Sequence, residues 1–161
     1  MLQIFGVVLI TVLCSVLVTS FCDGYDKTEY SYRDILTLLY VMKDKISAHS
    51  MPLSSILNVS IQLPYLSEID FVETARESGF VYALENNRNK LMIDEQDYEM
   101  LYNFFLSLGC STRSYVLENL SCTIKELEKK YEQTKALTIQ KKKVSSTVIV
   151  CSFLILIIFL I

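Results

Sequence analysis

The chain has 161 residues, of which 52% are hydrophobic and 20% charged, and its formal net charge is −3 at pH 7. Such an apolar average is too high for an ordinary soluble domain unless the excess is concentrated in membrane segments. The near-neutral charge, with Lys and Glu interleaved along the chain, argues against nucleic acid as a partner.

The apolar residues are concentrated at both ends of the chain. Residues 1–22 carry no charged side chain, and neither do residues 144–161. Each segment meets the length of about 18–20 apolar residues that a membrane-spanning helix needs. We therefore predict an N-terminal transmembrane helix at 1–22, a helical domain at 23–143 and a C-terminal transmembrane helix at 144–161.

The first segment could also be a secretory signal peptide. A signal peptide begins with Lys or Arg, but residues 1–6 contain neither, and Val18-Thr19-Ser20 would be a weak cleavage site. We favour a retained membrane helix. The alternative is a secreted or surface-displayed helical protein with a cleaved signal peptide and a C-terminal membrane anchor.

The basic residues predict the orientation in the membrane. Lys27 and Arg33 follow the first segment, and Lys141, Lys142 and Lys143 precede the second. The positive-inside rule then places the middle domain in the cytoplasm and both termini across the cell membrane. The lysine triplet also suits contact with anionic lipid headgroups of the bilayer.

A polar stretch at 23–28 separates the first segment from an amphipathic helix that we expect at 30–48. Its apolar side chains recur at helical spacing, at Ile35, Leu36, Leu39, Met42 and Ile46. We expect Tyr25, Tyr30 and Tyr32 at the membrane interface, where aromatic rings are favoured.

Two prolines organise the next part of the chain. We expect His49-Ser50-Met51-Pro52 to end the amphipathic helix, and Pro52 suits the first turn of a second helix that ends at Pro64. A third helix is predicted at 65–78, with Gly79 as its C-cap. In the following segment, 80–91, three asparagines weaken the helical pattern.

An acidic turn marks the start of the next predicted helix. Asp94 is expected at its N-cap, and the charges of Glu95, Asp97 and Glu99 suit the positive end of the helix dipole. Because carboxylates at neighbouring helical positions point in different directions, we do not expect a metal site here. We predict that these four residues form an exposed partner-binding surface. The helix that follows has one apolar face, formed by Tyr98, Leu101, Tyr102, Phe105 and Leu108.

The longest predicted helix runs from Thr112 to the last residue and contains no Gly or Pro. One stripe of it has the three-and-four spacing of a packed helix face: Leu117, Leu120, Ile124, Leu127, Tyr131 and Thr134. We expect this stripe to pack on the helical domain, and self-association into a homo-oligomer is the alternative. Lys125, Lys129 and Lys130 lie beside it as further candidate partner-binding residues.

No segment has the alternation of a strand, so we predict an all-α fold. It is a small helical bundle between two transmembrane helices, and the last helix continues into the second span. No nucleotide-binding, nucleophile or zinc motif is present. The single histidine, His49, lies in a helix-stop context that favours capping over general-base catalysis. The five cysteines lack metal spacing. We therefore expect no enzyme activity and no cofactor.

The order of these features resembles the stage III sporulation protein AB family of endospore-forming bacteria. The resemblance rests on Arg33 with Leu36, Leu39 and Ile46 before Pro52-Leu53, on residues 71–79 and 101–109, and on the Lys-rich exit into 144–161. It implies a subunit of a secretion-like complex in the mother-cell membrane around the developing spore.

The middle domain is also similar to the cytoplasmic domain of F-type platform proteins in type II secretion and type IV pilus machines. This similarity implies two kinds of partner, a cytoplasmic secretion ATPase and the other membrane subunits of the complex. We therefore expect a non-enzymatic membrane scaffold that docks the ATPase.

Overall fold

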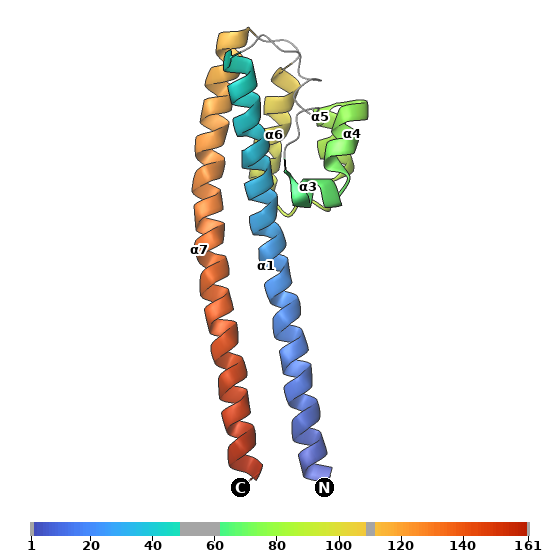
Figure 1. Cartoon of the computed structure of the whole chain (residues 1–161), viewed down its shortest axis with the longest axis vertical. Coiled ribbons are helices and arrows are strands. Elements are labelled where there is room, and N and C mark those ends of the chain that lie inside the picture. Colours follow the sequence, from blue (N-terminus) through green and yellow to red (C-terminus); the bar gives the residue numbers. More distant parts are fainter. Residues whose placement is uncertain (1, 49–61, 109–111, 161) are drawn as a thin grey trace. The chain divides into compact units, whose positions relative to one another are not determined.

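The computed structural model describes residues 2–48, 62–108 and 112–160, and it assigns helices but no strand to them. The helices are α1 (Leu2–Ala48), α3 (Pro64–Glu68), α4 (Phe71–Ser78), α5 (Phe80–Asn86), α6 (Glu95–Ser107) and α7 (Arg113–Leu160) (Figure 1). The predicted all-α class is confirmed for these parts of the chain.

The chain divides into two compact units. The paired-helix unit comprises Met1–Asp26 and Gln133–Ile161, and the helical domain comprises Lys27–Glu132. Both α1 and α7 contribute residues to each unit, because each helix runs through a boundary without interruption.

The paired-helix unit consists of the first part of α1 and the last part of α7, which run side by side (Figure 1). The Nζ atom of Lys142 lies 2.8 Å from Oδ1 of Asp26 and joins the two helices. Thr138 is buried, and its hydroxyl donates to the backbone carbonyl of Thr134 at 2.9 Å. This bond satisfies a polar group that would otherwise be costly to bury.

Among the helices of residues 2–48, 62–108 and 112–160, none is found to be both long and apolar enough to cross a membrane. The transmembrane helices at 1–22 and 144–161 stay predictions from the sequence.

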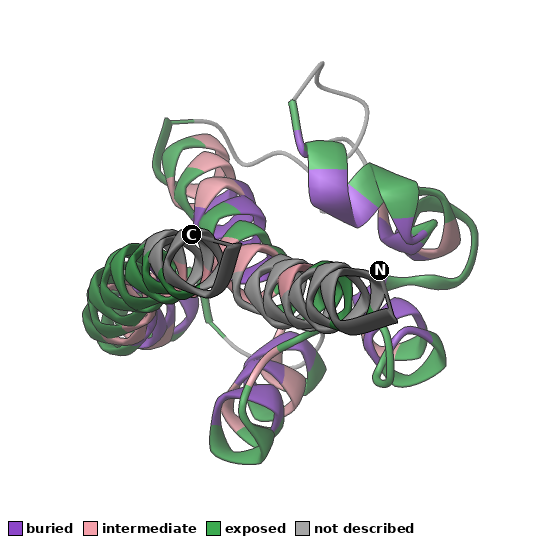
Figure 2. Ribbon diagram, turned by 90° about the horizontal axis from the view of Figure 1, so that it is seen from below, coloured by how far each residue is buried: buried purple, intermediate pink, exposed green. Residues whose placement is uncertain are grey.

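The core of the helical domain is built from one apolar side of each helix. The buried sides of the helices are purple in Figure 2. Phe80 of α5 stacks on Phe105 of α6, with ring centroids 5.0 Å apart. Each of the helices contributes to the largest fully buried apolar side chains, which are Tyr32, Leu38, Leu39, Met42, Leu66, Phe71, Leu84, Leu101, Leu120 and Leu127. Because the stripe of α7 joins this core at Leu120, Ile124 and Leu127, the packing interpretation of that stripe is confirmed.

The polar stretch at 23–28, expected to separate the first segment from the amphipathic helix, is itself helical, because α1 is one helix of 47 residues. The polar stretch contains a single helix-weakening residue, Gly24, and no proline. One glycine costs a helix only about 1 kcal/mol relative to alanine. The ion pair between Asp26 and Lys142 provides a tertiary contact for this polar stretch.

The helix predicted at 65–78 is two helices. Pro64 begins α3, because proline suits the first helical position, where no N–H donor is needed. Asp70 then separates α3 from α4, with a φ of 63°, a left-handed conformation that aspartate tolerates better than most residues. The helix predicted before Pro64, and His49 itself, lie outside the described residues.

The predicted C-terminal boundary of α4 and the predicted N-terminal boundary of α6 are confirmed. Gly79 lies between α4 and α5 and has a φ of 92°. Any residue with a side chain would be strained in this backbone conformation, so glycine suits the position. Asp94 occupies the N-cap position of α6. The next helix is observed to begin at Arg113, one residue after its predicted start.

Candidate partner-binding surface

Hydrogen bonds and ion pairs connect the acidic turn at the start of α6 to α1 and α7. The hydroxyl of Tyr32 on α1 donates to Oδ2 of Asp97 at 2.6 Å and accepts the backbone N–H of Asp94 at 3.2 Å. Nζ of Lys130 on α7 lies 3.1 Å from Oδ2 of Asp94 and 4.0 Å from Oδ2 of Asp97. These four residues, which we call the Tyr32 network, connect α1, α6 and α7.

Two groups of the Tyr32 network have raised pKa values, for different physical reasons. Burial raises the pKa of Tyr32 far above its usual range, and the hydrogen bond to Asp97 adds to the shift. The hydrogen bond to Asp94 likewise raises the pKa of Lys130. At neutral pH the phenol is therefore a neutral donor and the ammonium is charged. Since Tyr32 is only 2% exposed, no substrate can reach its hydroxyl.

The exposure expected of Asp97 is wrong, because only 4% of its surface is accessible. The register of α6 places Asp97 beside Tyr98 and one turn before Leu101, on the side of the helix that packs into the core. Its charge is tolerated there because Tyr32 donates to it and Lys130 lies nearby. Tyr32, predicted at the membrane interface, is instead the buried partner of this carboxylate.

Two other acidic residues of the turn form ion pairs on the surface. Asp94 makes no side-chain capping bond, and its carboxylate contacts Lys130. Glu95 pairs with Arg88, whose guanidinium also lies 4.8 Å from the ring centroid of Tyr98. Exposed ion pairs contribute little to stability, but a partner would have to break these bonds to use the charges.

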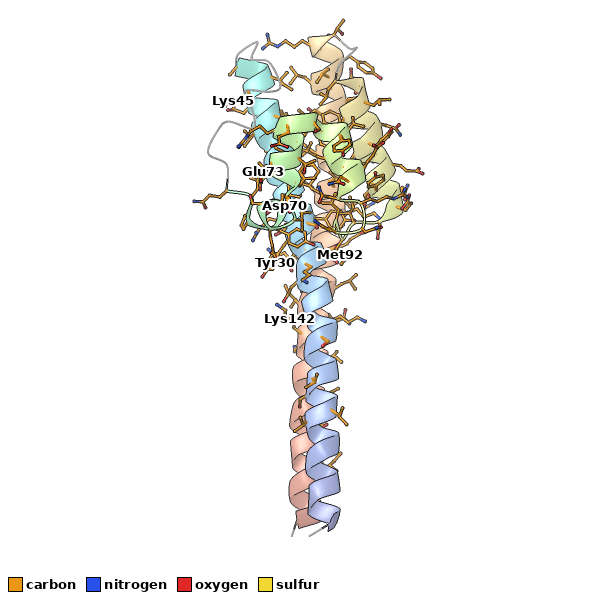
Figure 3. The ribbon with its side chains drawn as sticks, turned by 90° about the vertical axis from the view of Figure 1, so that its right-hand side faces the viewer. Tyr30, Lys45, Asp70, Glu73, Met92 and Lys142 are labelled. Carbon is orange, nitrogen blue, oxygen red and sulfur yellow. The ribbon has the colours of Figure 1, made fainter. Side chains whose placement is uncertain are left out.

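The remaining predicted residues are accessible. Glu99, Lys125 and Lys129 are exposed, and their side chains form no hydrogen bond or ion pair within the described parts of the chain. The basic triplet is also exposed, at Lys141, Lys142 and Lys143 of α7 in the paired-helix unit. Figure 3 labels Lys142, which makes the contact to Asp26.

Asp34 is a second buried carboxylate, and the sequence analysis missed it. It is 1% exposed, and its Oδ2 accepts the backbone N–H groups of Tyr65 at 2.8 Å and Leu66 at 3.3 Å. The neighbouring Arg33 contributes an ion pair of 3.1 Å. The residue before α3, Leu63, provides no capping side chain, so an aspartate on α1 caps α3 in its place.

Two more polar contacts connect neighbouring parts of the domain. Ser31, completely buried on α1, accepts the backbone N–H of Met92 at 3.3 Å. The hydroxyl of Tyr65 on α3 donates to the backbone carbonyl of Lys90 at 2.7 Å. Met92 lies at the same end of the domain as Tyr30, whereas Lys45 lies toward the other end (Figure 3).

Chemistry-bearing groups are sparse in the described ranges. His49 lies outside them. No group of three or more His, Cys, Asp or Glu residues is placed to hold a metal ion in residues 2–48, 62–108 and 112–160. Cys122 and Cys151 are exposed free thiols on α7.

A comparison with sequence models of protein families matches residues 3–161 to the family described as stage III sporulation protein AB. No curated protein and no solved structure gives a match. The family match covers essentially the whole chain, including both helices of the paired-helix unit and the complete helical domain.

Proposed function

The chain belongs to the stage III sporulation protein AB family, and from this membership we propose that it is a non-enzymatic membrane scaffold of a secretion-like channel complex between mother cell and forespore. Membership itself gives the chain a role in sporulation. The observation that supports the scaffold proposal is where the polar groups of the helical domain lie and what they bond to. Three buried polar side chains, those of Tyr32, Asp34 and Asp97, bond to the protein itself, whereas Glu99, Lys125 and Lys129 lie exposed and unpaired among the described residues.

Membrane attachment through both ends of the chain is part of this proposal. Residues 1–22 and 144–161 carry no charge, and the helices that contain them run side by side. A charged contact between these helices, Asp26 with Lys142, lies close to where the charged sequence begins. Such a position suits the boundary between lipid and water, and the lysine triplet suits the cytoplasmic side of that boundary.

The proposed partners are a cytoplasmic secretion ATPase and other membrane subunits of the complex. They come from the resemblance of the helical domain to F-type platform proteins. Glu99, Lys125 and Lys129 are the predicted docking residues that remain exposed and unpaired. The proposed surface is therefore the exposed side of α6 and α7.

The test is capture of the purified ATPase by the full-length chain in detergent. We expect the double variant Lys125→Glu, Lys129→Glu to bind about tenfold more weakly, with a smaller difference at high salt because exposed charges are screened. Lys90→Glu is the matched control, since Lys90 is exposed on a different part of the domain. Equal capture by both variants and the wild type would remove these lysines from the docking surface.

A further inference from the structure

A groove of about 340 Å³ lies between α6 and α7 in the helical domain. Its lining includes the apolar or weakly polar side chains of Met100, Phe104 and Cys122 and the polar side chains of Asn103, Asn119 and Glu126. All of these residues belong to the compact unit Lys27–Glu132. The groove is thus a feature of one unit, formed by two helices of its core.

The polar groups of this groove differ from those of the acidic turn. Asp94, Glu95 and Asp97 bond to Lys130, Arg88 and Tyr32.

In contrast, the side chains of Asn103, Asn119 and Glu126 make no hydrogen bond or ion pair with any described residue. They are available to a partner without the loss of an internal bond. A partner that pairs with them therefore avoids the cost of breaking an existing interaction.

Apolar surface is exposed next to these groups. Tyr115, which also lines the groove, is 52% exposed, and Leu106 on α6 is 57% exposed. Aromatic and aliphatic side chains around a shallow groove are the usual contacts for an amphipathic helix that lays its apolar face between two helices. Among the described residues that line the groove, Glu126 is the charged one, and its carboxylate favours a helix that carries a Lys or Arg.

We infer that this groove binds an amphipathic helix of the partner protein, which places an apolar side chain between α6 and α7 and a Lys or Arg against Glu126. The two asparagine amides donate to and accept from the polar edge of the same helix. This inference rests on the proposed function, because the partner is the ATPase proposed above. It adds the site on this chain and the chemistry of the segment that occupies it.

Cys122 provides a direct test, because its free thiol is exposed and lines the groove. The full-length chain in detergent is labelled with a bulky maleimide, and binding of the purified ATPase is measured. We expect the labelled wild type to lose at least about tenfold in affinity, since the label fills the space of the anchor side chain. Cys122→Ser, treated with the same reagent, is expected to bind like the unlabelled wild type.

A charge reversal tests the electrostatic part of the inference independently of labelling. Glu126→Lys should weaken ATPase binding about tenfold, because it repels the basic residue of the incoming helix. Glu118→Lys makes the same change on the same helix at an exposed position outside the groove lining, and should change binding less than twofold. Far-UV circular dichroism checks that each variant keeps its helix content.

The outcomes separate this inference from the proposed function. If the unlabelled wild type does not bind the ATPase, both are overturned. If it binds and neither the Cys122 label nor Glu126→Lys weakens binding, the groove is excluded and the scaffold proposal stands. Loss of binding in both cases, with the two controls intact, supports the groove.

Discussion

Asp97 and Tyr32 were each predicted at a surface, but a contact between them places both in the core of the domain. In the sequence, Asp97 is one of four acids at a helix start, and Tyr32 is one of three tyrosines near a predicted membrane segment. In the structure they are 65 positions apart along the chain and 2.6 Å apart in space, with both side chains buried. The apolar spacing of α6 could have revealed the burial of Asp97, because that residue precedes Leu101 by one turn. The pairing with Tyr32 could not be predicted, since nothing local links the two positions.

Removing the Tyr32 hydroxyl should destabilise the helical domain. Tyr32→Phe leaves the buried carboxylate of Asp97 without its closest donor, and a buried polar group without its partner costs about 1–3 kcal/mol. Tyr30→Phe is the matched control, because Tyr30 lies two residues away and is 41% exposed. Urea unfolding of the full-length chain in detergent measures both free energies. Equal values for the two variants would show that the hydrogen bond to Asp97 contributes no stability.

The same residues predict a loss of stability at high pH. The folded-state pKa values of Tyr32 and Lys130 are raised, so both groups hold their protons in the fold at a pH where the unfolded chain releases them. Their contribution is therefore complete below about pH 10, the ordinary range of both groups, and is lost as the pH rises above it. The measurement is the free energy of unfolding at several pH values between 8 and 11. In Tyr32→Phe the decline should be shallower, and parallel curves for the variant and the wild type would contradict this account.

At the scale of elements, periodicity predicted the long helices well and their interruptions poorly. The buried stripe of α7 and the cap position before α6 follow from apolar spacing and from acids at a helix start. The continuity of α1 through 23–28 did not follow, because a polar stretch with one glycine is compatible with a loop or with a helix. The break at Asp70 was also missed. It depends on one residue in a left-handed conformation, and no glycine or proline marks it in the sequence.

The dependence of α3 on α1 gives a prediction at this scale. Asp34 holds the N–H groups of Tyr65 and Leu66, so Asp34→Ala leaves two buried donors unsatisfied and should destabilise the domain by about 1–3 kcal/mol. Asp44→Ala is the control, since Asp44 is exposed on the same helix. Amide hydrogen exchange locates the effect. Exchange at Tyr65 and Leu66 should accelerate in Asp34→Ala alone, and unchanged protection there would show that Asp34 does not stabilise α3.

At the scale of the whole molecule, the chain comprises a helical domain, in which the buried side chains of Tyr32, Asp34 and Asp97 bond internally, and a pair of helices with uncharged ends. Composition predicted the two apolar ends and the middle domain. It could not reveal the partition into Met1–Asp26 with Gln133–Ile161 and Lys27–Glu132, because that partition depends on tertiary contacts. Tertiary contacts also explain why the proposed docking surface differs from the one predicted from the sequence. Three of the predicted acids are paired within the domain, whereas the groove between α6 and α7 keeps unpaired polar groups.

The central claim is a scaffold whose helical domain faces the cytoplasm from a membrane anchored at both ends. Protease accessibility of the full-length chain in right-side-out and inverted membrane vesicles tests it most directly. We predict that protease cleaves the domain in inverted vesicles and leaves it intact in right-side-out vesicles until detergent is added. Cleavage only from the outside of right-side-out vesicles would contradict both the orientation and the docking of a cytoplasmic ATPase, and would favour a surface-displayed protein.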